Sequence, residues 1–489
     1  MLKNKRLDLI LTMIAIFIAT FMTSVETTIV TTAMPTIISK LNGLALQSWV
    51  FAMYLLTTAV STPVYGKLSD QLGRKPIFVS GLIIFLLGSF LSGIAPNIYL
   101  LIIFRAIQGF GAGAVMPMTF TIIADLFPYD KRSNIIALNN TGWGISALLG
   151  PLIGGFVVDR LNWHWIFFIN VPLGIIVLIL ILIGFDESRK VKDKKANIDY
   201  KGTLSLTATL VSLLIFLQLI GETRLSIPLI LVMLVILIIS TVVLVYSERR
   251  SDDPIIPLPL FKNQLFKVQI LTTLLLSGVQ ISFQIYFPIW LQSVYRVSAS
   301  IAGLAITPSP VLWLPASFLV GILVKKFIPK RIAIPVLIIQ MLFYLLLVFA
   351  SLNFPMIMFY IIAAITGGGL GIIITMNTLI SQEVVPENDV GTASSMLTLG
   401  RTLGQTVMTG ILGLVFNLSI NHELVKYPNV PFQQVDRFIS SNQNSEASLI
   451  PSMQKIIIEG MHNVFLVTVV LFVIVLIVNI RDKNKNIIK

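Results

Sequence analysis

Long apolar runs separated by short polar turns dominate the pattern of this 489-residue chain. Fourteen runs reach about 20 residues, the length that a helix needs to cross a bilayer. Lipid offers no partner for backbone polar groups, so runs of this length and hydropathy predict helices rather than isolated strands. The runs lie near residues 8–33, 46–65, 76–95, 98–124, 134–158, 164–185, 202–221, 225–246, 268–292, 300–324, 332–351, 354–380, 390–418 and 460–480.

Composition agrees with this pattern. Hydrophobic residues make up 56% of the chain and charged residues 12%, whereas a soluble domain carries about 25% charged residues. We therefore predict an all-α integral membrane protein with fourteen spans. The absence of Cys excludes disulfides and thiolate metal sites. The three His residues fall in or beside loops, so we expect no metal site.

Basic residues orient the predicted spans. With the N-terminus inside, the cytoplasmic segments hold 26 Lys and Arg residues, the external segments hold 7, and two lie within spans. Basic residues collect in cytoplasmic loops, so both termini are expected in the cytoplasm of a multi-pass cell-membrane protein. The net charge of +13 then reflects topology and does not indicate nucleic acid as a partner. The basic, then apolar, N-terminus is interpreted as an uncleaved first span.

Three longer connections divide the chain. We predict an N-terminal six-helix bundle at 1–185, cytoplasmic linkers with two inserted spans at 186–267, and a C-terminal six-helix bundle at 268–489. The last part contains a long external loop at 419–459. "GKLSDQLGRKPI" from Gly66 has a weak echo in "GILVKKFIPKRI" from Gly321, which lacks the Asp, and paired halves are a common transporter plan.

Two opposite charges fall inside predicted spans of the first bundle. A charge at span depth costs about 2.5–3.5 kcal/mol even on insertion scales, so it predicts a function and a partner. Glu26 and Arg105 each lie about seven residues from the outer end of a span, at similar depth. A carboxyl in a low-dielectric site can hold a proton near neutral pH. The alternative is a purely structural ion pair.

A third intramembrane charge, Arg401, lies in the second half. No acidic residue occurs in any predicted span of that half. Three partners for Arg401 therefore remain as alternatives: a backbone carbonyl, an amide such as Gln405, and the substrate.

The short cytoplasmic turn "GKLSDQLGRK" has demanding spacing. Gly66 and Gly73 allow close helix approach and a tight turn. Asp70 can face the positive N-terminal end of a neighbouring helix, while Arg74 pairs with acidic groups. The turn is thus a candidate latch between bundles; the alternative is an ordinary basic cytoplasmic turn.

The fifth span carries the sequence "GWGISALLGPLIGG". Proline removes a backbone hydrogen bond and bends a helix, and glycines leave a face open for close packing. We expect this face to approach a helix of the opposite half, with ordinary small-residue packing as the alternative. The helix-bend motif consists of Gly142, Gly150, Pro151, Gly154 and Gly155.

Polar and aromatic residues near the predicted midplane are candidates for a substrate cavity, because mixed aromatic and amide linings suit amphiphilic ligands. Interhelical hydrogen bonding is the alternative for each. The candidates are Tyr54, Gln108, Asn140, Trp143, Gln280, Gln284, Asn377 and Arg401.

Together, "ETTIVTTAMP", "GKLSDQLGRK", "RAIQGFGAG", "GPLIGG" and "NWHWIFFINVPLG" resemble the major facilitator superfamily, and within it the fourteen-span drug:proton antiporters. The resemblance implies that Glu26, where many relatives have Asp, is the proton carrier and that Arg105 takes part in proton coupling. It also implies that Asp70 and Arg74 form the inner latch. "GPLIGG" is similar to the stretch that marks exporters.

These observations predict a secondary transporter that exports amphiphilic small molecules, monovalent cations or neutral compounds, in exchange for protons by alternating access. The proton gradient supplies the energy, no cofactor is expected, and a monomer in a bacterial cell membrane suffices. The alternative is a proton-coupled exporter of one endogenous metabolite or lipid. Neither a nucleophile–base set nor a phosphate-binding loop is present, so an enzyme is not expected.

Overall fold

The computed structural model describes residues 5–41, 47–187, 200–220, 226–251, 254, 256, 259–297, 299–386, 389–430, 434, 435, 438 and 449–484. All of the elements assigned within these residues are helical. They are α1 (Lys5–Leu41), α2 (Gln47–Leu72), α3 (Arg74–Gly93), α4 (Ile98–Leu126), α5 (Tyr129–Arg160), α6 (Trp165–Phe168), α7 (Asn170–Gly184), α8 (Tyr200–Ile220), α9 (Ile227–Arg250), η2 (Leu260–Lys262), α10 (Gln264–Val294), α11 (Ala299–Leu304), α12 (Pro308–Lys326), α13 (Pro329–Val348), α14 (Met356–Glu383), α15 (Val390–Leu424) and α17 (Ile450–Ile480).

The described helices match the predicted runs in order. Fourteen of them have fifteen residues or more, one for each run. Eleven helical segments in this part of the chain are long and apolar enough to cross a membrane. The number of spans and their orientation stay predictions.

The predicted extent of the loop at 419–459 is wrong. α15 continues to Leu424, and α17 begins at Ile450, so both ends of that segment are helical. The cause is that hydropathy marks where a helix leaves lipid, while backbone hydrogen bonds continue beyond that depth. Residues 431–433, 436, 437 and 439–448 lie outside the described residues.

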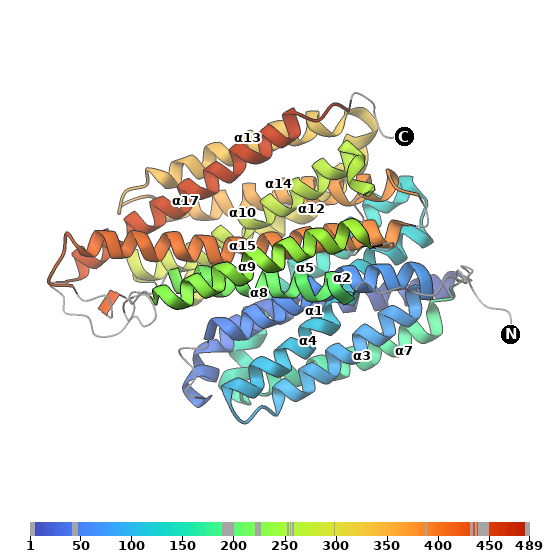
Figure 1. Cartoon of the computed structure of the whole chain (residues 1–489), viewed down its shortest axis with the longest axis horizontal. Helices are drawn as coiled ribbons and strands as arrows, with labels where there is room; N and C mark the ends of the chain where they lie inside the picture. Colours follow the sequence, from blue (N-terminus) through green and yellow to red (C-terminus); the bar gives the residue numbers. More distant parts are fainter. Residues whose placement is uncertain are drawn as a thin grey trace.

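The long helices run roughly parallel and form two groups of equivalent packing (Figure 1). In the first group, α1 packs on α5 and α7, and α2 packs on α4. In the second group, α10 packs on α15 and α17, and α12 packs on α14 in the same way. The start of α1 and the end of α17 lie at the same end of the molecule, at the right of Figure 1. We call this the inner end, following the predicted orientation.

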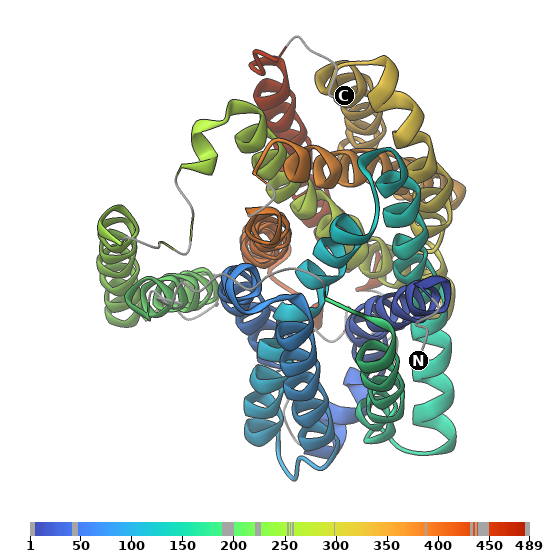
Figure 2. The same cartoon turned by 90° about the vertical axis from the view of Figure 1, so that its right-hand side faces the viewer.

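The two groups meet along two equivalent seams. α2 packs on α15, and α5 packs on α12. The pair α8 and α9 stands beside the first seam, at the left of Figure 2, where α8 contacts both α2 and α15. Leu206 and Leu210 of α8 belong to one buried cluster with Leu56 of α2 and Met396 of α15. The inserted pair therefore touches both halves of the molecule through α8.

Candidate functional site

Glu26 of α1 and Arg105 of α4 form an ion pair inside the first half. Both residues are 0% exposed. The guanidinium also donates to Gln108 Oε1 at 2.7 Å, and Asn170 of α7 donates to Glu26 Oε2 at 2.6 Å. The two charges that the sequence places at similar depth are thus in direct contact, and a buried pair needs such additional hydrogen bonds to offset its desolvation.

A polar shell surrounds this pair. The Tyr54 ring lies 4.3 Å from the Arg105 Cζ atom, and Arg105 Nε donates to the Val50 carbonyl at 3.3 Å. The Ser89 hydroxyl accepts from Gln108 at 3.1 Å and from Asn170 at 2.9 Å. Tyr54 and Gln108, expected in a cavity lining, instead belong to this buried network. Sequence reasoning missed the contributions of Asn170 and Ser89.

The arrangement restricts what Glu26 can do. A carboxylate with no exposed surface cannot meet a large ligand without a rearrangement of the surrounding helices. A proton on Glu26 would remove the negative charge that balances Arg105, leaving a buried guanidinium with neutral acceptors only, which is unfavourable. The protonation state of Glu26 therefore affects the packing of α1 against α4 and α7.

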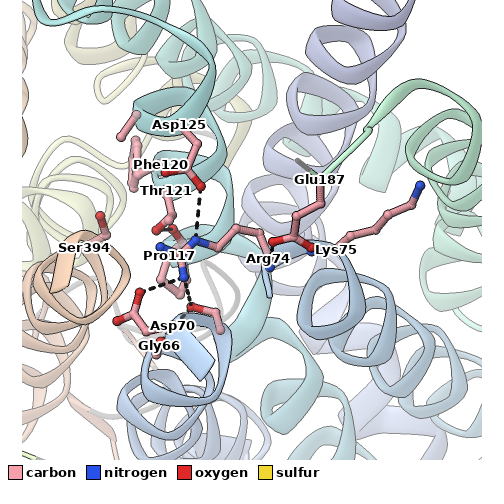
Figure 3. Close-up of polar contacts among 12 residues, drawn as sticks. Gly66, Asp70, Arg74, Lys75, Pro117, Phe120, Thr121, Asp125, Glu187 and Ser394 are labelled. Atoms are coloured by element: carbon pink, nitrogen blue, oxygen red, sulfur yellow. Dashed lines mark hydrogen bonds and ion pairs between the residues drawn. The ribbon is translucent and has the colours of Figure 1, made fainter. Parts of the chain in front are cut away.

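A second charged cluster joins the halves at the inner end (Figure 3). Asp70 of α2 accepts hydrogen bonds from the backbone N–H of Thr392 at 2.9 Å and from its hydroxyl at 2.6 Å. Thr392 lies in the first turn of α15, where backbone N–H groups lack helical partners and a negative charge is favoured. A Cβ atom on Gly66 would clash with Ser395 of α15, so this approach depends on glycine.

Arg74 connects Asp70 to the rest of the first half. It is 1% exposed and forms ion pairs with Asp70 at 2.7 Å and with Asp125 of α4 at 3.2 Å. The Glu187 carboxylate accepts from the backbone N–H groups of Arg74 and Lys75, which begin α3. Figure 3 shows Arg74 between these acids. Glu187 was missed by sequence reasoning, although an acid directly after a span is a visible signal.

The turn between α2 and α3 depends on Gly73. Its φ is 101°, in the left-handed region that favours glycine. A Cβ atom there would also meet the Glu187 carboxylate. The two glycines of "GKLSDQLGRK" thus have separate structural roles, Gly66 at the contact between halves and Gly73 at the turn.

Further contacts join the halves at the inner end and at mid-depth. Arg132 of α5 lies 3.8 Å from the Glu383 carboxylate of α14. The Gln382 amide donates to the Phe120 carbonyl at 3.3 Å. Nearer the middle, Asn140 of α5 donates to the Thr375 hydroxyl at 3.4 Å. The structure is therefore a conformer whose halves are joined at the inner end.

The glycine face of α5 corrects one expectation. Gly142 lies against Phe21, and a Cβ atom on Gly150 would clash with Thr28, both on α1 of the same half. Gly144 instead faces Pro310 of α12 across the seam. The opposite-half contact predicted for Gly150 is wrong, because a glycine pattern shows that close packing occurs without showing which helix supplies the neighbour.

The other members of that motif are only partly described. Gly154 is buried in α5. α5 continues as one helix through residue 151. Pro151 and Gly155 lie in this helix, but their surroundings are not among those that the structure describes.

The remaining cavity candidates fall into two sets. Asn377 donates to Thr273 at 2.9 Å, which ties α14 to α10 within the second half. Gln280 accepts from Gln405 at 3.4 Å, and Gln284 is half-buried on α10. Arg401 and Trp143 meet across the seam, with the Arg401 Cζ atom 4.5 Å from the Trp143 ring.

The described residues contain no group of three or more His, Cys, Asp or Glu side chains that could hold a metal ion. The charged groups described above are engaged in ion pairs and helix-end hydrogen bonds instead. The site is therefore built from protonatable and hydrogen-bonding side chains.

Two equivalent groups of membrane-length helices, joined by a charged contact at one end, define the class as a multi-pass membrane transporter. The chain belongs to the Major Facilitator Superfamily, whose family model matches residues 16–409. It is a transporter and not an enzyme.

Similar proteins include multidrug proteins of two bacteria. Multidrug resistance protein 3 of Bacillus subtilis (strain 168) is 35% identical over 384 residues, which cover 78% of this chain and 74% of that protein. Multidrug efflux pump SdrM of Staphylococcus aureus (strain N315) is 29% identical over 417 residues, which cover 84% of this chain and 90% of that protein.

Solved structures share the fold. The human organic anion transporter MFSD10 (TETRAN) gives a TM-score of 0.66 at 12% identity, over 97% of this chain and 99% of that one. A bacterial homolog of the human lysosomal transporter Spinster, in an inward-facing and occupied conformation, gives a TM-score of 0.58 at 16% identity. The match covers 96% of this chain and 95% of that one.

Proposed function

We propose that this protein exports amphiphilic small molecules, monovalent cations or neutral compounds, in exchange for protons. It works as a fourteen-span monomer in a bacterial cell membrane, with both termini in the cytoplasm and no cofactor. The observation that carries the proposal is the fully buried ion pair between Glu26 and Arg105. Multidrug relatives at about one-third identity support the substrate class.

In this proposal, Glu26 carries the proton and Arg105 favours its ionised form, because an opposite charge within contact distance stabilises a carboxylate. Glu26 has no exposed surface in this conformer. Substrate and proton therefore do not compete by direct contact with Glu26 here. Coupling instead runs through the ion pair: protonation weakens the contact between α1 and α4 and shifts the balance between conformers.

The contact between Asp70 and Thr392 acts as the inner latch of this cycle. It joins α2 to α15 only in conformers whose inner end is closed, so it stabilises the outward-facing side of the alternating-access equilibrium. Arg74 positions Asp70 and shares the charge with Asp125.

The experiment is transport in proteoliposomes with ethidium, a monovalent aromatic cation. Potassium and valinomycin hold the membrane potential at zero while a pH gradient is imposed. We expect ethidium to accumulate on the acidic side and the accumulation to vanish when the gradient is collapsed. Ethidium movement that ignores the pH gradient would contradict proton exchange.

A further inference from the structure

Arg401 is a buried cation with no anion beside it among the residues that the structure describes. It is 8% exposed, and among the described residues it has no ion pair and its Nε–H has no acceptor. It lies eleven residues from the start of α15, about 16 Å along the helix axis and so near mid-membrane. An unpaired charge at this depth is costly, so it indicates a ligand or a relay.

Two tryptophans flank this guanidinium. The Arg401 Cζ atom lies 4.5 Å from the Trp143 ring of α5 and 5.6 Å from the Trp313 ring of α12. Aromatic faces stabilise a cation, but they do not accept the hydrogen bonds that the N–H groups donate in the plane of the guanidinium. The indole Nε1–H groups of Trp143 and Trp313 are also buried and lack acceptors. Three buried donors on neighbouring side chains thus have no acceptor among the described residues.

The close seam between α5 and α12 positions these rings. Gly144, next to Trp143, lies against the Pro310 backbone, three residues before Trp313. The first ring comes from one half of the transporter, while Trp313 and Arg401 come from the other. A ligand held here would therefore contact both halves.

This place is separate from the proton site. Arg105 lies 21 residues from the inner end of α4, about 30 Å along its axis, whereas Arg401 is about 16 Å from the inner end of α15. Glu26 is engaged by Arg105 and Asn170. The two sites therefore consist of different residues.

We propose that Arg401, Trp143 and Trp313 form the binding site for the carboxylate end of aromatic zwitterionic substrates. The carboxylate accepts from the guanidinium and the indole N–H groups, and the aromatic part stacks on an indole face. This rests on the proposed export function and refines its neutral substrates to amphiphiles that carry both a carboxylate and an amine. Such acceptors satisfy donors whose burial is otherwise unfavourable.

The test uses two fluorescent probes that differ only by the carboxylate: Nε-dansyl-lysine, which is a zwitterion, and dansylcadaverine, which lacks the carboxylate. Binding to the purified protein in nanodiscs is followed by dansyl fluorescence, with no proton gradient present. We expect dansyl-lysine to bind about tenfold or more tightly than dansylcadaverine, since hydrogen bonds to charged groups are among the stronger ones.

Arg401→Gln should abolish this preference while dansylcadaverine still binds, which also shows that the variant is folded. Trp143→Phe and Trp313→Phe keep an aromatic ring but remove the N–H donor, so each should weaken dansyl-lysine several-fold. Arg250→Gln is the matched control, because Arg250 also lies over an aromatic ring, 4.3 Å from Tyr246, but at the exposed end of α9. It should leave both affinities unchanged.

Equal affinity of the wild-type protein for the two probes would overturn the proposal. Failure of the wild-type protein to bind either probe would overturn it as well. A preference for dansyl-lysine that survives Arg401→Gln would do the same. Should Arg401→Gln not fold, unchanged dansyl-lysine affinity in both Trp→Phe variants would overturn it. The binding measurement uses no proton gradient. Its result therefore stands by itself even if the ethidium experiment shows no proton exchange.

Discussion

At the residue scale, the pairing of Glu26 with Arg105 could be anticipated because a span tolerates few charges. Two opposite charges at one depth in the same half have few other partners. Asn170 and Ser89 could not be anticipated in the same way. Neutral polar residues are common in spans, and one sequence does not show which face of a helix meets which neighbour.

Removing one member of the Glu26–Arg105 pair should destabilise the protein more than removing both. Breaking a buried pair leaves an uncompensated charge and costs about 3–5 kcal/mol. We expect Arg105→Gln to unfold at a clearly lower temperature than the wild type, and the double variant Glu26→Gln/Arg105→Gln to recover most of the loss. Thermal unfolding in detergent measures both.

Additive losses in that double variant would show that the two side chains do not interact. Glu383→Gln is a suitable control, since Glu383 is 33% exposed and its cationic partner Arg132 lies at 3.8 Å. An exposed pair contributes about 0–1 kcal/mol. This control should therefore change the unfolding temperature little.

Arg401 shows the opposite limit of sequence reasoning. The lack of an acid in the second-half spans was visible in the sequence, but Trp143 and Trp313 come from two other helices. Only the three-dimensional arrangement shows that aromatic rings, and no carboxylate, surround the guanidinium in the described part of the chain.

At the element scale, the apolar runs predicted the helices and their order but not their ends or their neighbours. α1 extends to Leu41 and α17 begins at Ile450, both beyond the apolar runs. Neighbours depend on packing between distant segments, so the partner of Gly150 was assigned to the wrong half.

Gly150→Ala should destabilise the first half, because the added Cβ atom would clash with Thr28 of α1. Gly413→Ala in α15 is the matched control, since nothing lies within 4 Å of a Cβ atom there. The control should be neutral or gain up to about 1 kcal/mol from helix propensity. The unfolding temperatures of the two variants measure this difference. Equal changes in unfolding temperature would contradict the packing described for α5.

Gly66→Ala should weaken the contact between α2 and α15, and Ser395→Gly should restore it by removing the clashing side chain. The chain has no Cys, so spin labels can be placed at Leu72→Cys and Lys326→Cys without a background. These exposed positions end α2 and α12 at the inner end.

Pulsed electron paramagnetic resonance should show longer distances between these labels in Gly66→Ala. In the double variant Gly66→Ala/Ser395→Gly the distances should return toward the wild-type distribution. An unchanged distribution in Gly66→Ala would mean that this contact does not keep the inner end closed.

At the scale of the whole molecule, Glu26 is the one carboxylate that the sequence places deep within a predicted span, which implies one proton per cycle. Exchange of one proton for a monovalent cation moves no net charge, whereas exchange for a neutral zwitterion moves one charge inward. That charge corresponds to about 2.3 kcal/mol per 100 mV. Dications would move charge outward against an inside-negative potential and should be poor substrates.

Vesicles in which potassium and valinomycin set the potential at fixed pH test this stoichiometry. Dansyl-lysine transport should respond to the potential and ethidium transport should not. A strong potential dependence for ethidium would require a second proton site.

Uphill ethidium transport by Glu26→Gln, in proteoliposomes with an imposed pH gradient, tests directly whether Glu26 carries the exchanged proton. Glutamine keeps the size of the side chain and one of the two acceptor oxygens that face Arg105 and Asn170, but it cannot exchange a proton. We predict no accumulation by Glu26→Gln and partial accumulation by Glu26→Asp, with both variants reconstituted to wild-type levels. Accumulation by Glu26→Gln at the wild-type level would contradict the account.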